Sequence, residues 1–133
     1  MDSLSFKTTA KKQILDITDD IQNWLGNQKA TLGLCHLFIK HTTAALTTAD
    51  LDEGGTDQDY LDAFEALMPK LNYRHPHNPP HVVDHILSSI IGPSLTVPVE
   101  NGELQLGTWQ RIVLVELDGP RKREVAITLT KMT

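Results

Sequence analysis

Histidine is the residue type best able to do chemistry in this chain of 133 residues, and its copies fall in two short regions. His81 and His85 are four residues apart, so they share one face if that segment is helical. Neutral imidazoles at this spacing can converge on one divalent metal ion. Protonated imidazoles can instead donate to phosphate, so the spacing leaves a metal site and an anion site both open. The full set is His36, His41, His75, His77, His81 and His85.

Two of these histidines, His75 and His77, lie in a loop rich in His, Asn and Pro at residues 71–80. They are two residues apart and point to one side if the loop is extended. His41 follows an apolar run at residues 32–40, which predicts a strand, and a histidine at a strand end is well placed to face a cleft. A lone histidine is more often a hydrogen-bonded surface or core residue, so each of these assignments competes with a structural one.

A basic cluster near the carboxyl end could bind the charge of a phosphorylated ligand. Arg121, Lys122 and Arg123 follow the turn sequence Asp118-Gly119-Pro120. Arg121 and Arg123 project alike if a strand has begun, and two adjacent guanidinium groups can hold a phosphate bidentately. The alternative is a solvated strand start, in which charge discourages pairing with another sheet edge.

An acidic run between residues 50 and 59 offers a carboxylate partner for the histidines. Its default interpretation is a solvated loop that leads into a helix. Its functional interpretation is that one member, Asp59, faces the histidines, where it would either hydrogen-bond a metal-binding imidazole or act as a base.

The bulk composition excludes several classes of function. The net charge of −5 gives no general basic field, so we expect neither a nucleic-acid nor a membrane partner. The single cysteine, Cys35, lies in an apolar run and is expected to be a core residue. The start of the chain has no signal-like apolar core and no apolar stretch approaches the ~20 residues of a membrane span, which predicts a cytoplasmic protein.

The elements that must position these residues alternate between strands and helices. Alternating or apolar segments predict strands at residues 4–8, 13–17, 32–40, 95–99, 104–106, 111–117 and 125–130. Helical periodicity predicts helices that begin near residues 18, 56 and 82. We therefore expect a single α+β domain over residues 1–133.

Three sequence blocks together resemble the YjbQ family, also labelled secondary thiamine-phosphate synthase. They are His41-Thr42-Thr43-Ala44-Ala45-Leu46, residues 85–95 from His85 to Leu95, and residues 101–123, which contain Gly107-Thr108-Trp109-Gln110 and Asp118-Gly119-Pro120-Arg121-Lys122-Arg123. A smaller block, Tyr73-Arg74-His75, matches as well, so the resemblance covers nearly the whole chain.

The resemblance implies a compact α+β fold with a curved, mixed, half-barrel-like sheet carrying two to three helices, assembled as a homotrimer. It implies a pocket lined by His41, His75 and His85, which would hold a divalent metal such as zinc or magnesium. Phosphate would bind at Thr42, Thr43, Arg121 and Arg123, and His41 and Asp59 are the expected catalytic residues. The implied activity joins a pyrimidine diphosphate to a thiazole phosphate and releases pyrophosphate.

This chain departs from the family pattern at two places. Asp50 stands where many members carry Glu, and its side chain is one methylene shorter. His81 lies where many members have an Asn-rich stretch, which makes it an additional candidate ligand.

Three functions compete on the sequence. The leading one is an enzyme for a small phosphorylated substrate. The second is a non-catalytic module that binds a metal or a phosphorylated metabolite, and the third is a structural trimer in which the histidines only pack.

Overall fold

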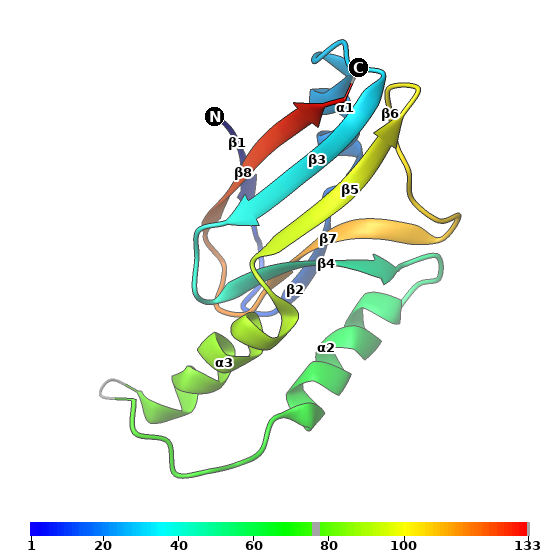
Figure 1. The fold of residues 1–133 in the computed structure, drawn as a ribbon. Helices are drawn as coiled ribbons and strands as arrows, with labels where there is room; N and C mark the ends of the chain where they lie inside the picture. The colour runs from blue at the N-terminus through cyan, green and yellow to red at the C-terminus, as the bar shows by residue number, and fades with distance from the viewer. Residues whose placement is uncertain (76–77, 133) are drawn as a thin grey trace.

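The computed structural model describes residues 1–75 and 78–132. Their strands form two sheets, and three α-helices and one short 3₁₀ helix complete the described elements (Figure 1). The strands are β1 (Asp2–Lys7), β2 (Gln13–Asp16), β3 (Leu32–Ile39), β4 (Ala44–Asp50), β5 (Ser94–Glu100), β6 (Glu103–Leu104), β7 (Gln110–Glu116) and β8 (Lys122–Lys131). The helices are α1 (Thr18–Gly26), α2 (Thr56–Leu67), η1 (Pro79–His81) and α3 (Val82–Ile91).

The larger sheet has the strand order β1-β8-β3-β5-β6 and curls into half a barrel (Figure 1). Its inner face is apolar because alternate residues of each strand point inward, as Cys35, Leu37 and Ile39 do on β3. The hairpin between β5 and β6 turns at Asn101 and Gly102, both with positive φ, which is the backbone that this turn requires.

The smaller sheet has the order β2-β7-β4 and is covered on both faces. On β7, Ile112 and Leu114 face the core shared with the larger sheet and helix α1. The alternate residues Val113 and Val115 face a second core, which is closed by α2 and α3. The result is a layered domain in which α2 and α3 lie on the side of the small sheet opposite the half-barrel (Figure 1).

The α+β class, the curved sheet and the helices are confirmed. The expectation of one mixed sheet is corrected, because every strand pair among the described residues is antiparallel and the strands divide between two sheets. The cause is a pair of corners, residues 40–43 and 117–121, at which the chain leaves one sheet and enters the other.

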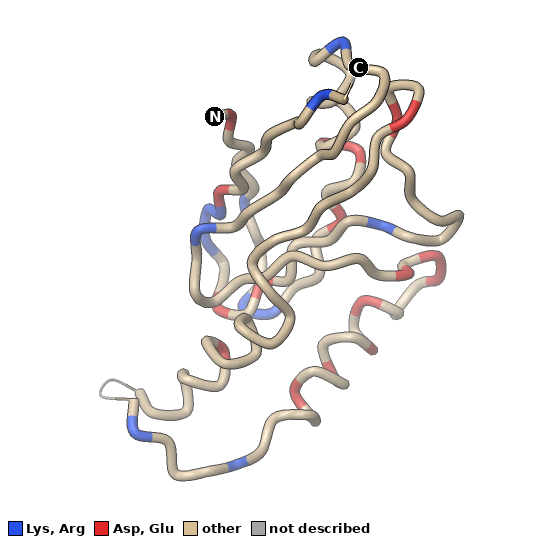
Figure 2. The backbone as a smooth tube through the Cα atoms, in the orientation of Figure 1, with Lys and Arg blue, Asp and Glu red and all other residues tan. Residues whose placement is uncertain are grey.

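Charge is distributed unevenly over this framework. Basic residues gather near the corner where β1 and β3 end and β8 begins, whereas the charged residues of α2 are all acidic (Figure 2). Within the described ranges, no helix has the length and apolar character needed to cross a membrane.

Candidate functional site

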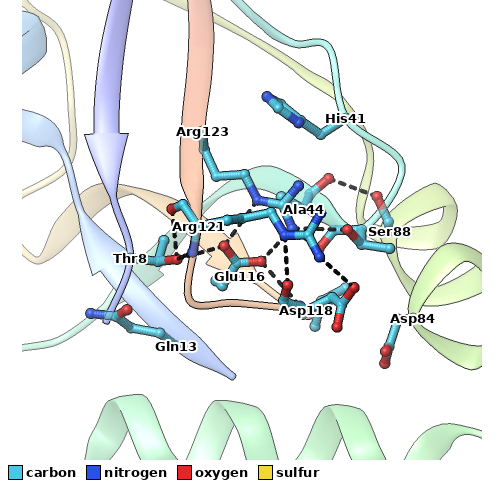
Figure 3. Close-up of polar contacts among 12 residues, drawn as sticks. Thr8, Gln13, His41, Ala44, Asp84, Ser88, Glu116, Asp118, Arg121 and Arg123 are labelled. Atoms are coloured by element: carbon cyan, nitrogen blue, oxygen red, sulfur yellow. Dashed lines mark hydrogen bonds and ion pairs between the residues drawn. The ribbon is translucent and has the colours of Figure 1, made fainter. Parts of the chain in front are cut away.

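A buried ion pair holds the two corners of the fold together. Arg123 and Glu116 are almost fully buried, and the guanidinium grips the carboxylate with both Nε and Nη2, at 2.9 and 2.5 Å (Figure 3). Nη2 also donates to the carbonyl oxygen and to Oγ1 of Thr43, at 3.0 and 2.8 Å. Thr8 completes the arrangement by donating to Oε1 of Glu116 at 2.7 Å. Arg123 therefore fixes the corner, and its charge is already matched by a carboxylate.

The electrostatics of Glu116 agree with this structural role. Burial alone would raise the pKa of Glu116, but the hydrogen bonds from Arg123, from Thr8 and from the backbone of Asp118 outweigh it and lower the pKa. The carboxylate thus stays ionised in the interior because its partners are fixed around it.

The two arginines that the sequence places together have different environments. Arg121 lies before the first residue of β8, and 51% of its side chain is exposed. Its Nε donates to the carbonyl oxygen of Asp118 at 2.8 Å and its Nη2 to Oδ2 of Asp118 at 2.9 Å. Of the predicted phosphate-binding pair, Arg121 is thus open to solvent and Arg123 is not.

His41 lies at this corner, close to both arginines. Its Nε2 accepts the backbone N–H of Glu124 at 3.1 Å, so the proton of the neutral ring is on Nδ1. Partial burial, followed by the charge of Arg123, lowers the pKa of His41. The imidazole is therefore kept neutral near pH 7.

Three other histidines form a cluster at the start of α3. His75, His81 and His85 each present a ligand atom within 4.8 Å of the other two, and all three are half-buried. The rings of His75 and His85 stack with centroids 5.3 Å apart, and His81 meets His85 edge-on at 4.9 Å. Around one tetrahedral zinc ion such nitrogens lie roughly 3.4 Å apart, so small side-chain movements would complete the set.

The predicted metal-binding set was His41, His75 and His85. The structure brings His75 and His85 together, with His81 as the third member. His41 belongs to no such group among the described residues. His77 lies outside the described residues.

Asp118 links the histidine cluster to Arg121. Its Oδ2 accepts from His81 Nε2 and from Arg121 Nη2, each at 2.9 Å, and its Oδ1 accepts from Lys11 at 3.1 Å. Its partial burial acts to raise the pKa of Asp118, but the hydrogen bonds from Lys11 and His81 prevail and lower it. A carboxylate bonded to one ring nitrogen leaves the other nitrogen of His81 for a metal, which is a common arrangement for metal-binding histidines.

Asp84 is a second carboxylate beside His81, and unlike Asp118 it is buried. It is only 6% exposed, forms an ion pair with Lys12 and lies 3.8 Å from His81 Nε2. His81, Asp84 and Asp118 form another group with ligand atoms within 4.8 Å of one another. The spacing of His81, Asp84 and His85 on one helical face could have identified Asp84 from the sequence, whereas nothing local marked Asp118 or Lys12.

The remaining predicted residues are arranged as follows. Thr43 is buried against Arg123, and Thr42 is exposed beside it. Asp59 is exposed in the first turn of α2 and belongs to neither of the two potential ligand groups in the described residues. Within the part of the chain that the structure describes, the carboxylates that form a potential ligand group with His81 are Asp84 and Asp118.

A cavity of about 860 Å³ opens beside His81 and Asp84. Its walls come from α2, from the segment that follows α2, from the start of α3 and from the lysines at positions 11 and 12. The candidate site thus adjoins a space large enough for a small organic molecule.

Comparison with known proteins gives one consistent result. The family model described as UPF0047 protein YjbQ-like matches residues 2–132. A UPF0047 protein of Archaeoglobus fulgidus is 38% identical over 125 residues, which cover 93% of this chain and 96% of that protein. A UPF0047 protein of Mycobacterium tuberculosis strain H37Rv is 40% identical over 118 residues, which cover 86% of each chain. The crystal structure of an uncharacterised YjbQ/UPF0047 family protein from Clostridium acetobutylicum is 32% identical, has a TM-score of 0.88 and aligns with 98% of this chain and 100% of that one.

Proposed function

The chain belongs to the UPF0047 YjbQ-like family, and we propose that it is an enzyme for a small phosphorylated substrate. The observation that carries the proposal is the shared carboxylate of Asp118. One of its oxygens binds both His81 of the histidine cluster and the exposed guanidinium of Arg121. His81, a candidate metal ligand, and Arg121, a candidate anion ligand, are thereby held close together, because each lies 2.9 Å from the same oxygen.

The metal part of the proposal rests on His75, His81 and His85. Three imidazoles with a fourth position open to solvent or substrate are typical of catalytic zinc sites. A divalent ion there would withdraw charge from a phosphoryl oxygen. Asp118 would orient His81 and make its ring a better ligand.

The anion part rests on Arg121 and on Lys11. Both side chains are more than half exposed, and both contact the carboxylate of Asp118 that His81 also contacts. They can turn toward a phosphate while Arg123 remains in the interior. Thr42 stays a predicted contributor from the neighbouring corner.

The reaction that we propose is transfer with release of pyrophosphate, of the thiamine-phosphate synthase type, and its support is the family resemblance. Arginine and metal would stabilise the charge that develops on the leaving group. Nε2 of His41 could act as a base only after its hydrogen bond from the backbone N–H of Glu124 is broken. A homotrimeric assembly and a cytoplasmic location stay predictions that follow from the sequence.

Elemental analysis of the purified protein tests the metal site first. We expect about one zinc or other divalent ion per chain, lost in His85→Ala and in His81→Ala. The matched control is His36→Ala, because His36 lies on β3 between Thr96 and Thr130, away from the cluster, and should leave metal content unchanged. Pyrophosphate release by the metal-loaded protein, reduced at least tenfold in Arg121→Ala, would support the enzyme. Equal metal content in all four proteins would refute the histidine site.

One observation favours a non-catalytic alternative. Asp84 and Asp118, the carboxylates nearest the cluster, are already paired with Lys12 and Lys11, so neither is available as a base without breaking an ion pair. Stoichiometric metal and tight phosphate binding, without turnover in a pyrophosphate-release assay, would identify a binding protein.

A further inference from the structure

The turn that leads into β7 holds a tryptophan in solvent. Trp109 is 63% exposed and, among the described residues, belongs to neither of the two apolar cores. The other tryptophan of the chain, Trp24, packs against the larger core and donates from Nε1 to Asp2 at 2.8 Å. Because tryptophan is the largest apolar side chain and is mostly covered in folded proteins, an exposed one points to a contact outside the chain.

Hydrogen bonds fix this turn although its tryptophan packs against neither core. The backbone N–H of Gln110 donates to the carbonyl oxygen of Gly107 at 3.1 Å, and Oε1 of Gln110 accepts the backbone N–H of Gly107 at 3.0 Å. Nε2 of Gln110 donates to Oγ1 of Thr48 on β4 at 3.1 Å. Trp109 is thus presented by a turn that is tied to the sheet, which lowers the entropy cost of binding a ligand against its ring.

Trp109 lines a cavity of about 410 Å³ that has Asp50 and Tyr60 in the same wall. The hydroxyl oxygen of Tyr60 accepts the backbone N–H of Asp50 at 3.2 Å, which holds the second ring beside the carboxylate. Oδ1 of Asp50 accepts the backbone N–H of Asp52, and no basic side chain of the described residues forms an ion pair with Asp50. Two aromatic rings and a carboxylate without a cationic partner therefore border one space.

This cavity lies far from the candidate site. Asp50 pairs with Gln110 at one end of the β4–β7 ladder, and Ala44 pairs with Glu116 at the other. Six strand steps put these two ends roughly 20 Å apart. The surroundings of the cavity are acidic, because the loop after β4 and the helix α2 carry aspartate and glutamate (Figure 2). This field attracts a cation and repels an anion.

We propose that the cavity binds a small organic cation, with its ammonium group against the face of Trp109 and beside the carboxylate of Asp50. The face of an aromatic ring attracts a cation, and quaternary ammonium groups are commonly held in this way. Tyr60 supplies the second ring. A bare metal ion fits less well, since it requires several oxygen or nitrogen ligands in place of rings. The ligand class is thus a quaternary or alkylated amine, and this inference does not rest on the proposed function.

Choline and 3,3-dimethyl-1-butanol test the proposal, because the two molecules have the same shape and differ in charge. Isothermal titration calorimetry measures both affinities. We expect choline to bind with a Kd on the order of 1 mM or below, and the neutral alcohol to bind at least about tenfold more weakly. In Trp24→Phe, Trp109 is the one tryptophan left, and choline should change its fluorescence emission with the same midpoint.

Two pairs of variants locate the cation. Asp50→Asn should weaken choline binding at least about fivefold, whereas Asp57→Asn, the same change of charge at an exposed position outside the cavity wall, should alter it by less than about twofold. Trp109→Leu should also weaken choline binding at least about fivefold, and Trp109→Phe should retain most of it, because phenylalanine keeps an aromatic face. Asp50 and Trp109 are both exposed, so these variants should fold normally.

Several results would overturn the inference. Equal affinity for choline and the neutral alcohol would show that charge is not recognised, and no detectable choline binding would show that there is no such site. Equal losses in Asp50→Asn and Asp57→Asn would assign the attraction to the general acidic field. Full affinity in Trp109→Leu, or unchanged emission of Trp109 on saturation, would place the cation elsewhere.

Discussion

Replacing Arg123 by methionine should destabilise the protein far more than the same replacement at Arg121, two residues earlier. The side chain of Arg123 is 1% exposed, and that of its partner Glu116 is fully buried. Methionine fills much of the space of arginine but, among the described residues, leaves the carboxylate of Glu116 with Thr8 and the backbone of Asp118 as its donors. The folded state then contains a buried charge that is no longer paired.

The magnitude follows from this burial. Removing one partner of a buried ion pair costs about 3–5 kcal/mol, which is a large share of a total stability of about 5–15 kcal/mol. Arg121 is 51% exposed and its partner Asp118 retains Lys11 and His81. Its replacement should therefore cost no more than about 1 kcal/mol.

Urea denaturation at pH 7 measures both effects. We expect a lower midpoint with an unchanged slope for Arg123→Met and a small shift for Arg121→Met. The double variant Arg123→Met/Glu116→Leu removes both charges together. It should be less destabilised than the sum of its single variants, with a coupling free energy on the order of 2 kcal/mol or more. Equal costs at positions 121 and 123, or strictly additive single variants, would refute the assignment of Arg123 to the interior.

Two further predictions concern backbone packing and acid stability. Gly33→Ala should cost about 1–3 kcal/mol, because a Cβ there would overlap the carbonyl oxygen of Thr130 across the β3–β8 pair, whereas Gly26→Ala, with open space around it, should be neutral or slightly stabilising. Thermal melts of the two variants compare them, and similar melting temperatures would contradict the close approach at Gly33. The lowered pKa of Glu116 means that its contribution to stability is present above the ordinary glutamate pKa of about 4.3 and is lost as the pH falls through the folded-state pKa. Urea midpoints between pH 3 and 6 should therefore fall less steeply in Glu116→Gln than in the unmodified protein, and parallel curves would argue against the assignment.

Much of the fold could be predicted from local pattern. The alternation of residues 111–117 and the apolar run of residues 32–40 matched β7 and β3, because each strand has at least one continuously buried face. The turn sequence Asn101-Gly102 matched a hairpin with positive φ at both residues. The division into two sheets could not be predicted this way, since it depends on corners at residues 40–43 and 117–121. Arg123 and Glu116 flank the second corner, and Arg123 reaches the first through Thr43, a contact between segments far apart in the sequence.

The candidate site could be predicted only in part, for a similar reason. Helical spacing correctly joined His81 to His85, because four residues complete about one turn. The third histidine of the cluster comes from outside this helix. Sequence spacing could not decide whether His75 or His41 would join His81 and His85. The strand period failed for Arg121 and Arg123, because β8 begins at Lys122 and Arg121 still belongs to the turn. The side chain of Arg121 donates to Asp118, three residues earlier in the turn, whereas the side chain of Arg123 donates to Glu116 in the interior.

The segment from Glu116 to Asp118 therefore couples the stability of the fold to the geometry of the site. Glu116 anchors the interior through Arg123, and its Oε2 also accepts the backbone N–H of Asp118 at 3.0 Å. Asp118 in turn holds His81 and Arg121 with one oxygen. Because a single carboxylate bonds both the buried guanidinium and the backbone of the residue that orients the candidate ligands, damage to the interior pair should displace Asp118. A loss of metal affinity in a Glu116 variant would then arise from position alone, without any contact between Glu116 and the metal.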